Sequence, residues 1–174
     1  MMRPPFSFLA FSFLAFFLCV AGLLGSFPLP SYSADTNTDS DMPVEAQTLP
    51  KEPVTLHLSK SQSMLLQIEV ARGAADRTHG LMGRTSLDEK GGMLFVFDNE
   101  RPVSMWMKNT HIPLDMLFLN KKGEVVHVHE NATPESEEII SSAVPCAAVL
   151  ELNGGSVKKW AIQKGTRVSH PFFK

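Results

Sequence analysis

The chain has 174 residues, with 16 Lys and Arg against 18 Asp and Glu, and this length suits one compact domain with extensions. Arg3 is the one charged residue before residue 35, so residues 35–174 keep 15 Lys and Arg against 18 Asp and Glu, a net charge of −3. This balance, without a basic stripe, argues against nucleic acid as a partner.

The N-terminus has the three parts of an export signal. Arg3 gives a basic start, residues 6–25 (FSFLAFSFLAFFLCVAGLLG) carry no charge, and small residues follow, ending at Ser33 and Ala34. This order is typical of a secretory signal peptide, so we predict that residues 1–34 are a cleaved signal and that the domain is periplasmic or secreted. About 20 apolar residues can also span a bilayer, and an uncleaved membrane anchor, touching the membrane only through residues 6–25, is the alternative.

A polar segment follows the signal. Residues 35–53 (DTNTDSDMPVEAQTLPKEP) contain proline and no aromatic side chain, which is the composition of a flexible linker. We therefore expect a single folded domain over residues 54–174. Cys146 is the one cysteine after the signal, so this domain has no internal disulfide, and we expect a small buried side chain there.

The apolar pattern of the domain changes between strand and helix periods along the chain. The expected strands are Val54–Leu58, Met64–Val70, Met93–Phe97, Val103–Met107, Leu114–Leu119, Glu124–His129, Ala147–Leu152 and Thr166–His170. The expected helices are Gly73–Met82, which would stop at Gly83, and Ser156–Ile162, which would stop at Gly165. Short connections favour antiparallel pairing. We predict a β-rich α+β fold: a small antiparallel curled sheet or barrel-like body of about eight short strands with two short helices.

Five segments, in this order, carry a resemblance to a known family. They are RTHGLMGR (77–84), GGMLFVF (91–97), MWMKNTHIPLD (105–115), VLEL (149–152) and AIQKG (161–165). Together they resemble the bacterial and archaeal family called domain of unknown function 192 (DUF192), over about residues 65–170. The resemblance implies a compact β-rich α+β domain that is exported in many members. It implies no activity.

The MWMKNTHIPLD segment places polar side chains between apolar ones. If the strands on either side of it are neighbours, Lys108 and Asn109 lie in a loop at the rim of the sheet, where binding residues are common. Asp115 would lie on an apolar face, where a carboxylate needs a partner. We predict a ligand site lined by Arg84, Trp106, Lys108, Asn109 and Asp115. The alternative is a structural network in which Asp115 accepts hydrogen bonds from loop amides or an arginine.

Three functions fit this sequence. The leading hypothesis is a non-enzymatic binding module of the cell envelope, whose partner is a small molecule or an envelope protein and which needs no cofactor. An envelope hydrolase with Asp115 or a histidine as general base is the second. The third is a metal site: His127 and His129 would share a strand face with Val125, and His111, Asp115 or Glu130 would supply another ligand.

Overall fold

The structure is a computed structural model that describes residues 43–173. The expected signal or membrane anchor at residues 1–34 lies outside the described residues, as do residues 35–42 of the expected linker. None of the helices between residues 43 and 173 has the length and apolar character that a membrane span needs.

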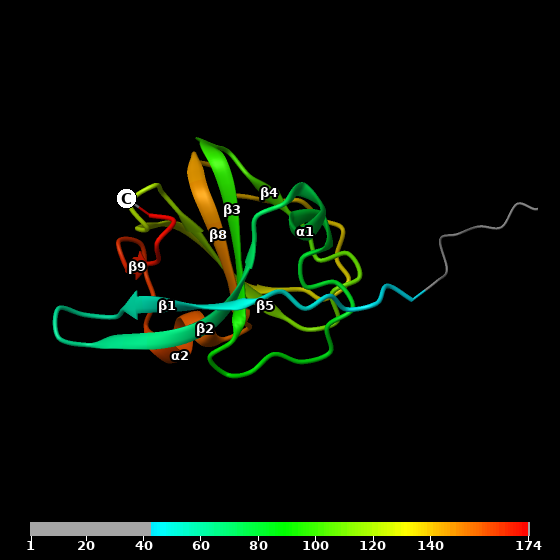
Figure 1. The fold of residues 1–174 in the computed structure, drawn as a ribbon, viewed down its shortest axis with the longest axis horizontal. Coiled ribbons are helices and arrows are strands. Elements are labelled where there is room, and N and C mark those ends of the chain that lie inside the picture. Colours follow the sequence, from blue (N-terminus) through cyan, green and yellow to red (C-terminus); the bar gives the residue numbers. More distant parts are fainter. Residues whose placement is uncertain (1–42, 174) are drawn as a thin grey trace, which may run out of the picture. The chain divides into compact units, whose positions relative to one another are not determined.

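Nine strands and two short helices make up the described part of the chain (Figure 1). The strands are β1 (Lys51–His57), β2 (Ser63–Ala71), β3 (Gly92–Arg101), β4 (Ser104–Met105), β5 (Leu114–Leu119), β6 (Val125–Ala132), β7 (Ile140–Ser141), β8 (Cys146–Asn153) and β9 (Arg167–Ser169). The helices are α1 (Ala74–His79) and α2 (Ser156–Trp160).

Seven of these strands form one sheet, in the order β6-β5-β8-β3-β2-β1-β9, while β4 and β7 form a separate two-stranded sheet. The pairing of β2 with β3 is parallel, and α1 lies in the connection between these two strands. The other strand pairs are antiparallel. The predicted β-rich α+β fold, with a curled sheet and two short helices, is confirmed.

The curl brings the two edge strands of the large sheet together. The backbone N–H of Val125 donates to the carbonyl of Thr166 at 2.9 Å, and the N–H of Val168 donates to the carbonyl of Gly123 at 2.7 Å. Gly123 has a φ of +74°, and a Cβ atom there would lie 2.2 Å from the carbonyl oxygen of Val168. Only glycine allows this close approach of the β6 and β9 ends.

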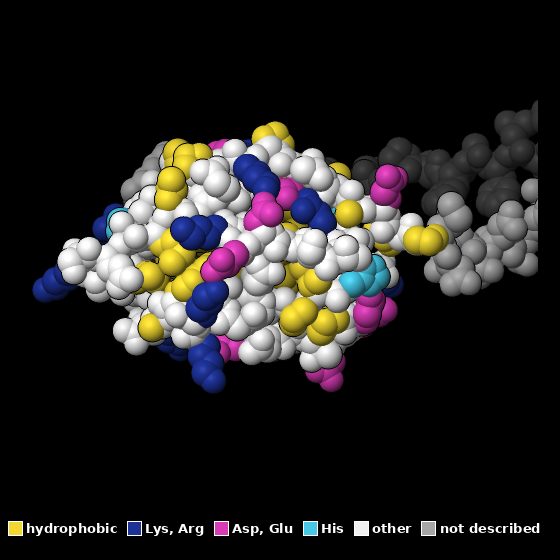
Figure 2. All heavy atoms as spheres, turned by 90° about the horizontal axis from the view of Figure 1, so that it is seen from below, with side chains coloured by type: hydrophobic (Ala, Val, Ile, Leu, Met, Phe, Trp, Pro, Cys, Tyr) yellow, Lys and Arg dark blue, Asp and Glu magenta, His cyan; other side chains and the backbone are white. Residues whose placement is uncertain are grey.

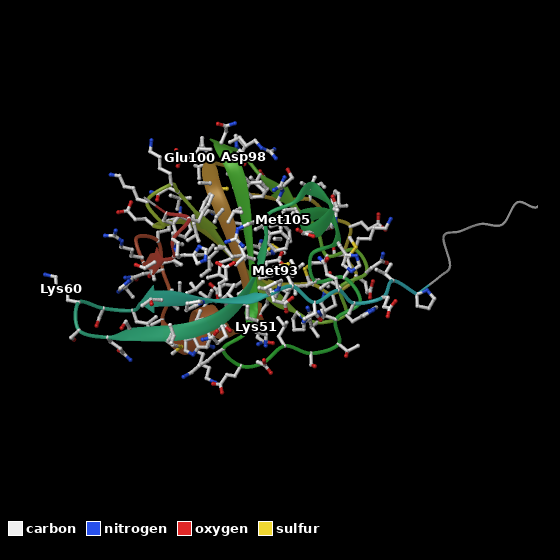
Figure 3. The ribbon with its side chains drawn as sticks, in the orientation of Figure 1. Lys51, Lys60, Met93, Asp98, Glu100 and Met105 are labelled. Carbon is white, nitrogen blue, oxygen red and sulfur yellow. The ribbon has the colours of Figure 1, made fainter. Side chains whose placement is uncertain are left out.

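Alternating side chains give the sheet two buried faces. On β8, Leu150 and Leu152 belong to a core inside the curl, which α2 also enters through Val157 and Trp160. Val149 belongs to a second core on the opposite face, together with Leu81, Val103 and Met107 from the chain around α1 and β4. Figure 3 shows Met93 and Met105 in the interior, with Lys60 and Glu100 at the periphery. By alternation, Glu151 must also face the second core.

The domain begins earlier than expected. β1 starts at Lys51, three residues before the predicted start at Val54, and pairs Lys51 with Glu69 and Pro53 with Gln67 of β2. The backbone N–H of Leu49 also donates to the Glu69 carboxylate at 2.6 Å. The expected linker was therefore too long at its C-terminal end, because backbone pairing with β2 does not require apolar side chains.

The first helix ends earlier than expected. Gly80, and not Gly83, follows its last residue, with a φ of +53° and its N–H bonded to the carbonyl of Asp76 at 2.8 Å. A Cβ at this glycine would lie 3.1 Å from the ring of Phe95. Gly80 therefore ends the helix and leaves room for Phe95, both of which require the missing side chain.

The expected strand Val103–Met107 does not join the large sheet. Its short β4 pairs instead with β7, an unpredicted strand in which Ile140 lies opposite Met105. β5 is paired with β6 and β8. Residues 108–113 therefore connect two different sheets, and the geometry on which the predicted ligand site depended is not formed.

Candidate functional site

Asp115 is fully buried, and both of its carboxylate oxygens accept backbone hydrogen bonds. Oδ1 accepts from the N–H of Asn131 at 2.8 Å, and Oδ2 accepts from the N–H of Val157 at 2.7 Å. These bonds join β5 to β6 and to the start of α2. The structural alternative expected loop amides or an arginine as donors, whereas the observed donors belong to a strand and a helix. Because the carboxylate is fully buried and bonded to the backbone, the structure argues against Asp115 as a general base.

Arg84 also has a structural role, because its guanidinium bonds to other residues of the domain. Its Nη2 atom lies 2.8 Å from both carboxylate oxygens of Glu69, and its Nε donates to the carbonyl of Gln47 at 2.9 Å. Only 2% of the surface of Glu69 is exposed. The ion pair holds the segment before β1 against β2, so Arg84 anchors this segment and does not line a binding cavity.

Lys108 and Asn109 lie in an exposed turn. The ammonium of Lys108 is 3.6 Å from the carboxylate of Glu137, and both side chains are solvent-accessible. Asn109 has a φ of +55°, and its carbonyl accepts the N–H of Gly83 at 2.8 Å. Such a left-handed residue suits a turn, which asparagine tolerates better than most side chains. Lys108 is therefore a surface residue, and Asn109 is half-buried in the turn.

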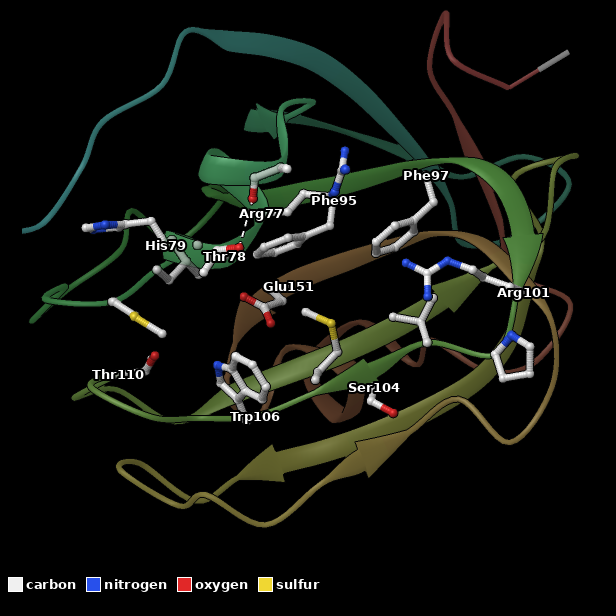
Figure 4. A pocket seen from close by; sticks show the side chains of 17 residues that line it. Arg77, Thr78, His79, Phe95, Phe97, Arg101, Ser104, Trp106, Thr110 and Glu151 are labelled. Carbon is white, nitrogen blue, oxygen red and sulfur yellow. Dashed lines mark hydrogen bonds between the residues drawn. The ribbon is translucent and has the colours of Figure 1, made fainter. Parts of the chain in front are cut away.

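Of the five predicted site residues, Trp106 alone lines a cavity that lies beside α1. This cavity has a volume of about 410 Å³ and lies among α1, the turn after α1, β3, β4 and β8 (Figure 4). We call it the Glu151 cavity. Its volume is within the range of about 300–1,000 Å³ that small-molecule sites occupy. Trp106 is 46% exposed, so its indole forms part of an open wall.

Glu151 carries its carboxyl into this cavity from the middle of the sheet. It pairs in register with Met93 on β3 and Met116 on β5, and both methionines are fully buried. Figure 4 shows the carboxyl pointing into the space between Phe95 and Trp106. Burial raises the pKa of Glu151 to about 8 and is the one cause of the shift, so no cation of the described chain offsets it.

Two cationic side chains lie at the mouth of the cavity. The guanidinium carbons of Arg77 and Arg101 lie 5.6 Å and 5.4 Å from the centre of the Phe97 ring. Arg77 also donates to the carbonyls of Val96, at 3.1 Å, and Arg72. Within residues 43–173 the Arg101 guanidinium has no hydrogen bond or ion pair, so its fork of N–H donors remains open.

The structure does not complete the expected metal site. The ring of His127 lies 5.4 Å from that of Phe118, and burial, with Lys164 and His129 nearby, lowers the pKa of His127. A register shift in β6 lies between Val125 and the two histidines, and the Val125 side chain packs in the core inside the curl. Among the described residues, no three His, Cys, Asp or Glu side chains form a group that could hold a metal ion.

Sequence reasoning missed Glu151, although it lies in the VLEL segment and inside the predicted strand Ala147–Leu152. A single carboxylate in the middle of an otherwise apolar buried strand was the available signal. The sequence could not show which neighbours surround it, because Met93 and Met116 come from strands 58 and 35 residues earlier in the chain.

A family model for DUF192, described as an uncharacterised group, matches residues 56–170. The chain belongs to the DUF192 family. This match contains the predicted range of about 65–170, and Trp106 and Glu151 both lie inside it. No curated protein matches the chain at a significant level.

Two crystal structures resemble this DUF192 protein closely. A proposed transcription regulator from Sinorhizobium meliloti is 44% identical, with a TM-score of 0.67, and the match covers 72% of this chain and 95% of that one. A protein of unknown function from Novosphingobium aromaticivorans is 34% identical, with a TM-score of 0.68, and the match covers 75% and 94%. They support the fold and the family.

Proposed function

We propose that this DUF192 domain is a non-enzymatic binding module of the cell envelope, and that a small molecule occupies the Glu151 cavity. The carrying observation is the carboxyl of Glu151, which is 3% exposed, has no partner within residues 43–173 and points into open space. An unpartnered buried carboxyl costs stability. A ligand that bonds to it would offset this cost, whereas packing alone would favour an apolar side chain.

The walls of the cavity suit a small ligand. Phe95, Met105 and Trp106 supply aromatic and thioether surface, while Glu151 and Arg101 supply a few polar groups at defined places. Small-molecule sites commonly combine mostly apolar walls with few oriented polar groups. Trp106 is the one residue common to this site and the site predicted from the sequence.

Placement in the envelope rests on the signal-like composition of residues 1–34. A small molecule is favoured over nucleic acid by the net charge of −3 of residues 35–174. Figure 2 shows basic and acidic side chains interspersed over the face that it draws, with no continuous basic stripe on that face. Binding by the cavity residues requires no metal or other cofactor.

Native mass spectrometry of the untagged chain, purified from its own host, tests the proposal against the denatured mass. We expect a reproducible excess mass in the wild-type protein and its loss in Glu151→Gln, which keeps the side-chain volume and removes the carboxylate. The surface variant Glu137→Gln is the matched control and should keep the excess mass. A bare polypeptide mass for the wild-type protein, in every extract of the host, would overturn the proposal.

An enzyme is the second candidate, because Glu151 has the pKa of a general acid that stays protonated at neutral pH. His79 lines the same cavity, and its Nε2 is buried with no hydrogen-bond partner among the described residues. The captured molecule distinguishes the two functions. Its chemical conversion over time by wild-type protein, but not by Glu151→Gln, would show an enzyme, while its recovery unchanged supports a binding module.

A further inference from the structure

We infer that the ligand of the Glu151 cavity has two charged ends, a cationic amine that pairs with Glu151 at the floor and an anionic group that reaches Arg101 at the mouth. The inference rests on the proposed function and adds the chemical class of the ligand. It comes from the placement of a buried carboxyl group at one end of the cavity and of guanidinium groups at the other, with Phe95 and Met105 also in its lining.

The floor favours a cation. Glu151 stands between the thioethers of Met93 and Met116, with the ring of Phe95 and the indole of Trp106 on either side of its carboxyl in Figure 4. Aromatic faces and a carboxylate both attract an ammonium group, and this attraction is stronger away from water. Since burial is the one cause that shifts the pKa of Glu151, the described chain supplies no cation of its own there.

The mouth favours an anion. Arg77 and Arg101 both lie against the ring of Phe97, so two guanidinium groups stand at one end of the cavity. Arg77 already donates to two backbone carbonyls, and Arg101 keeps its donors open within the described residues. A guanidinium fork matches the two oxygens of a carboxylate, which makes Arg101 the anion-binding residue.

The two ends lie at different levels of the sheet, which suits a molecule whose charges are separated. Glu151 is level with Met93, and the arginine side chains lie against the ring of Phe97, four residues further along β3, a backbone separation of about 13 Å at the usual rise of a strand. Phe95 lies between these positions on the same face. The ligand therefore carries an apolar spacer between its charges, and this spacer would lie along Phe95 and Met105.

Four small probes separate these features. In ε-aminocaproate, a five-carbon methylene spacer separates the amine from the carboxylate; norleucine is its isomer, with both charges at one end. Hexylamine carries only the cation, and hexanoate only the anion. Isothermal titration calorimetry of the full chain with each probe gives four affinities. We expect ε-aminocaproate to bind tightest, hexylamine to bind about tenfold more weakly, and norleucine and hexanoate to bind weakest.

Variants assign the two ends. Glu151→Gln should abolish binding of both amines, whereas Arg101→Gln should reduce the affinity of ε-aminocaproate to that of hexylamine and leave hexylamine unchanged. Glu137→Gln and Lys122→Gln are matched surface controls and should change neither affinity. Circular dichroism spectra that match the wild-type spectrum show that each variant is folded.

The pH dependence provides a second readout. An ammonium pairs with the ionised carboxylate, whose fraction rises about tenfold per pH unit below the pKa of Glu151, so amine affinity should rise by about that factor. This rise should stop near pH 8, where Glu151 is ionised. If a protonated Glu151 instead donates a hydrogen bond to the ligand, the affinity stays level below pH 8 and falls above it. That result would overturn the inference that a cationic amine binds Glu151.

The outcomes separate this inference from the proposed function. If hexanoate binds as tightly as ε-aminocaproate and its binding survives Glu151→Gln, the amine is wrong and the cavity remains a binding site. Equal binding of norleucine overturns the two-ended arrangement. If no probe binds while native mass spectrometry shows a bound molecule, the ligand class is wrong and the proposed function stands. If neither experiment shows binding, both the proposed function and the inferred ligand class are wrong.

Discussion

The carboxylate of Asp115 on β5 accepts the backbone N–H of Val157 at the start of α2, with an Oδ2–N distance of 2.7 Å. Its other oxygen accepts the N–H of Asn131. One fully buried side chain thus satisfies two backbone donors that are 26 residues apart, and it joins the helix to the edge of the sheet.

Replacing this carboxylate should destabilise the domain. In Asp115→Ala the buried N–H of Val157 and the partly buried N–H of Asn131 lose their acceptor, so we expect the free energy of unfolding to fall by about 2–5 kcal/mol. Urea denaturation measures the change. Lys108→Ala, at an exposed ion pair, should cost less than about 0.5 kcal/mol. If Asp115→Ala costs no more than Lys108→Ala, water replaces the hydrogen bonds that the Asp115 carboxylate makes.

The Arg84–Glu69 pair should be essential for the segment before β1. Arg84→Met leaves the Glu69 carboxylate buried without its cation, which typically costs about 3–5 kcal/mol. We expect faster proteolysis before Lys51 and lower stability in urea. The double variant with Glu69→Gln should recover much of the loss, since no unpaired charge then remains buried. Additive losses in this double-mutant cycle would show that the two side chains act independently.

Glu151 should make stability depend on pH in an unusual direction. Its pKa is raised from 4.5 to about 8, so between these values the folded state keeps a proton that the unfolded state releases. Rising pH therefore favours unfolding, by up to about 1.4 kcal/mol per pH unit, and the effect ends above the folded-state pKa. Urea denaturation across this range should show the slope in the wild-type protein and not in Glu151→Gln. Parallel curves would show that water reaches the carboxyl.

Trp106 should report binding in the Glu151 cavity. The chain has two tryptophans, and Trp160 lies in the core inside the curl, away from the face that Glu151 occupies. In Trp160→Phe, the emission of Trp106 should shift to shorter wavelength when ε-aminocaproate excludes water from its 46% exposed indole. Trp106→Ala should weaken binding of the probe at nearly unchanged stability. An unaltered spectrum at saturating probe would place the ligand elsewhere.

Several elements followed from local pattern. The strand Leu114–Leu119 was predicted with its observed bounds, because its run is almost entirely apolar and a glycine turn and a second strand come after it. Strands β2 and β8 differ from prediction by one residue at each end. The family also followed from the sequence, since its WMKNT and VLEL strings can be read without any knowledge of neighbours.

Other elements depended on partners that periodicity does not reveal. β4 and β7 are two residues long, and each is a strand only because the other lies beside it. A pattern of alternating side chains shows which face of a strand is apolar, but not which strand is next to it. The predicted site relied on such an assumption about neighbours: Asp115 lies on β5 of the large sheet, whereas Trp106 follows β4 of the small one.

The sequence by itself determined the β-rich class of the domain, its family and most of its buried strands. The local spacing of apolar residues is enough to predict which segments are strands and which of their positions are buried. Tertiary structure decided the roles of the two buried acids. Asp115 meets backbone donors from β6 and α2, while Glu151 meets thioethers from β3 and β5 and an open cavity. The order of the strands decides whether a buried carboxylate lies next to backbone donors, which gives it a structural role, or next to a cavity, where it can bind a ligand.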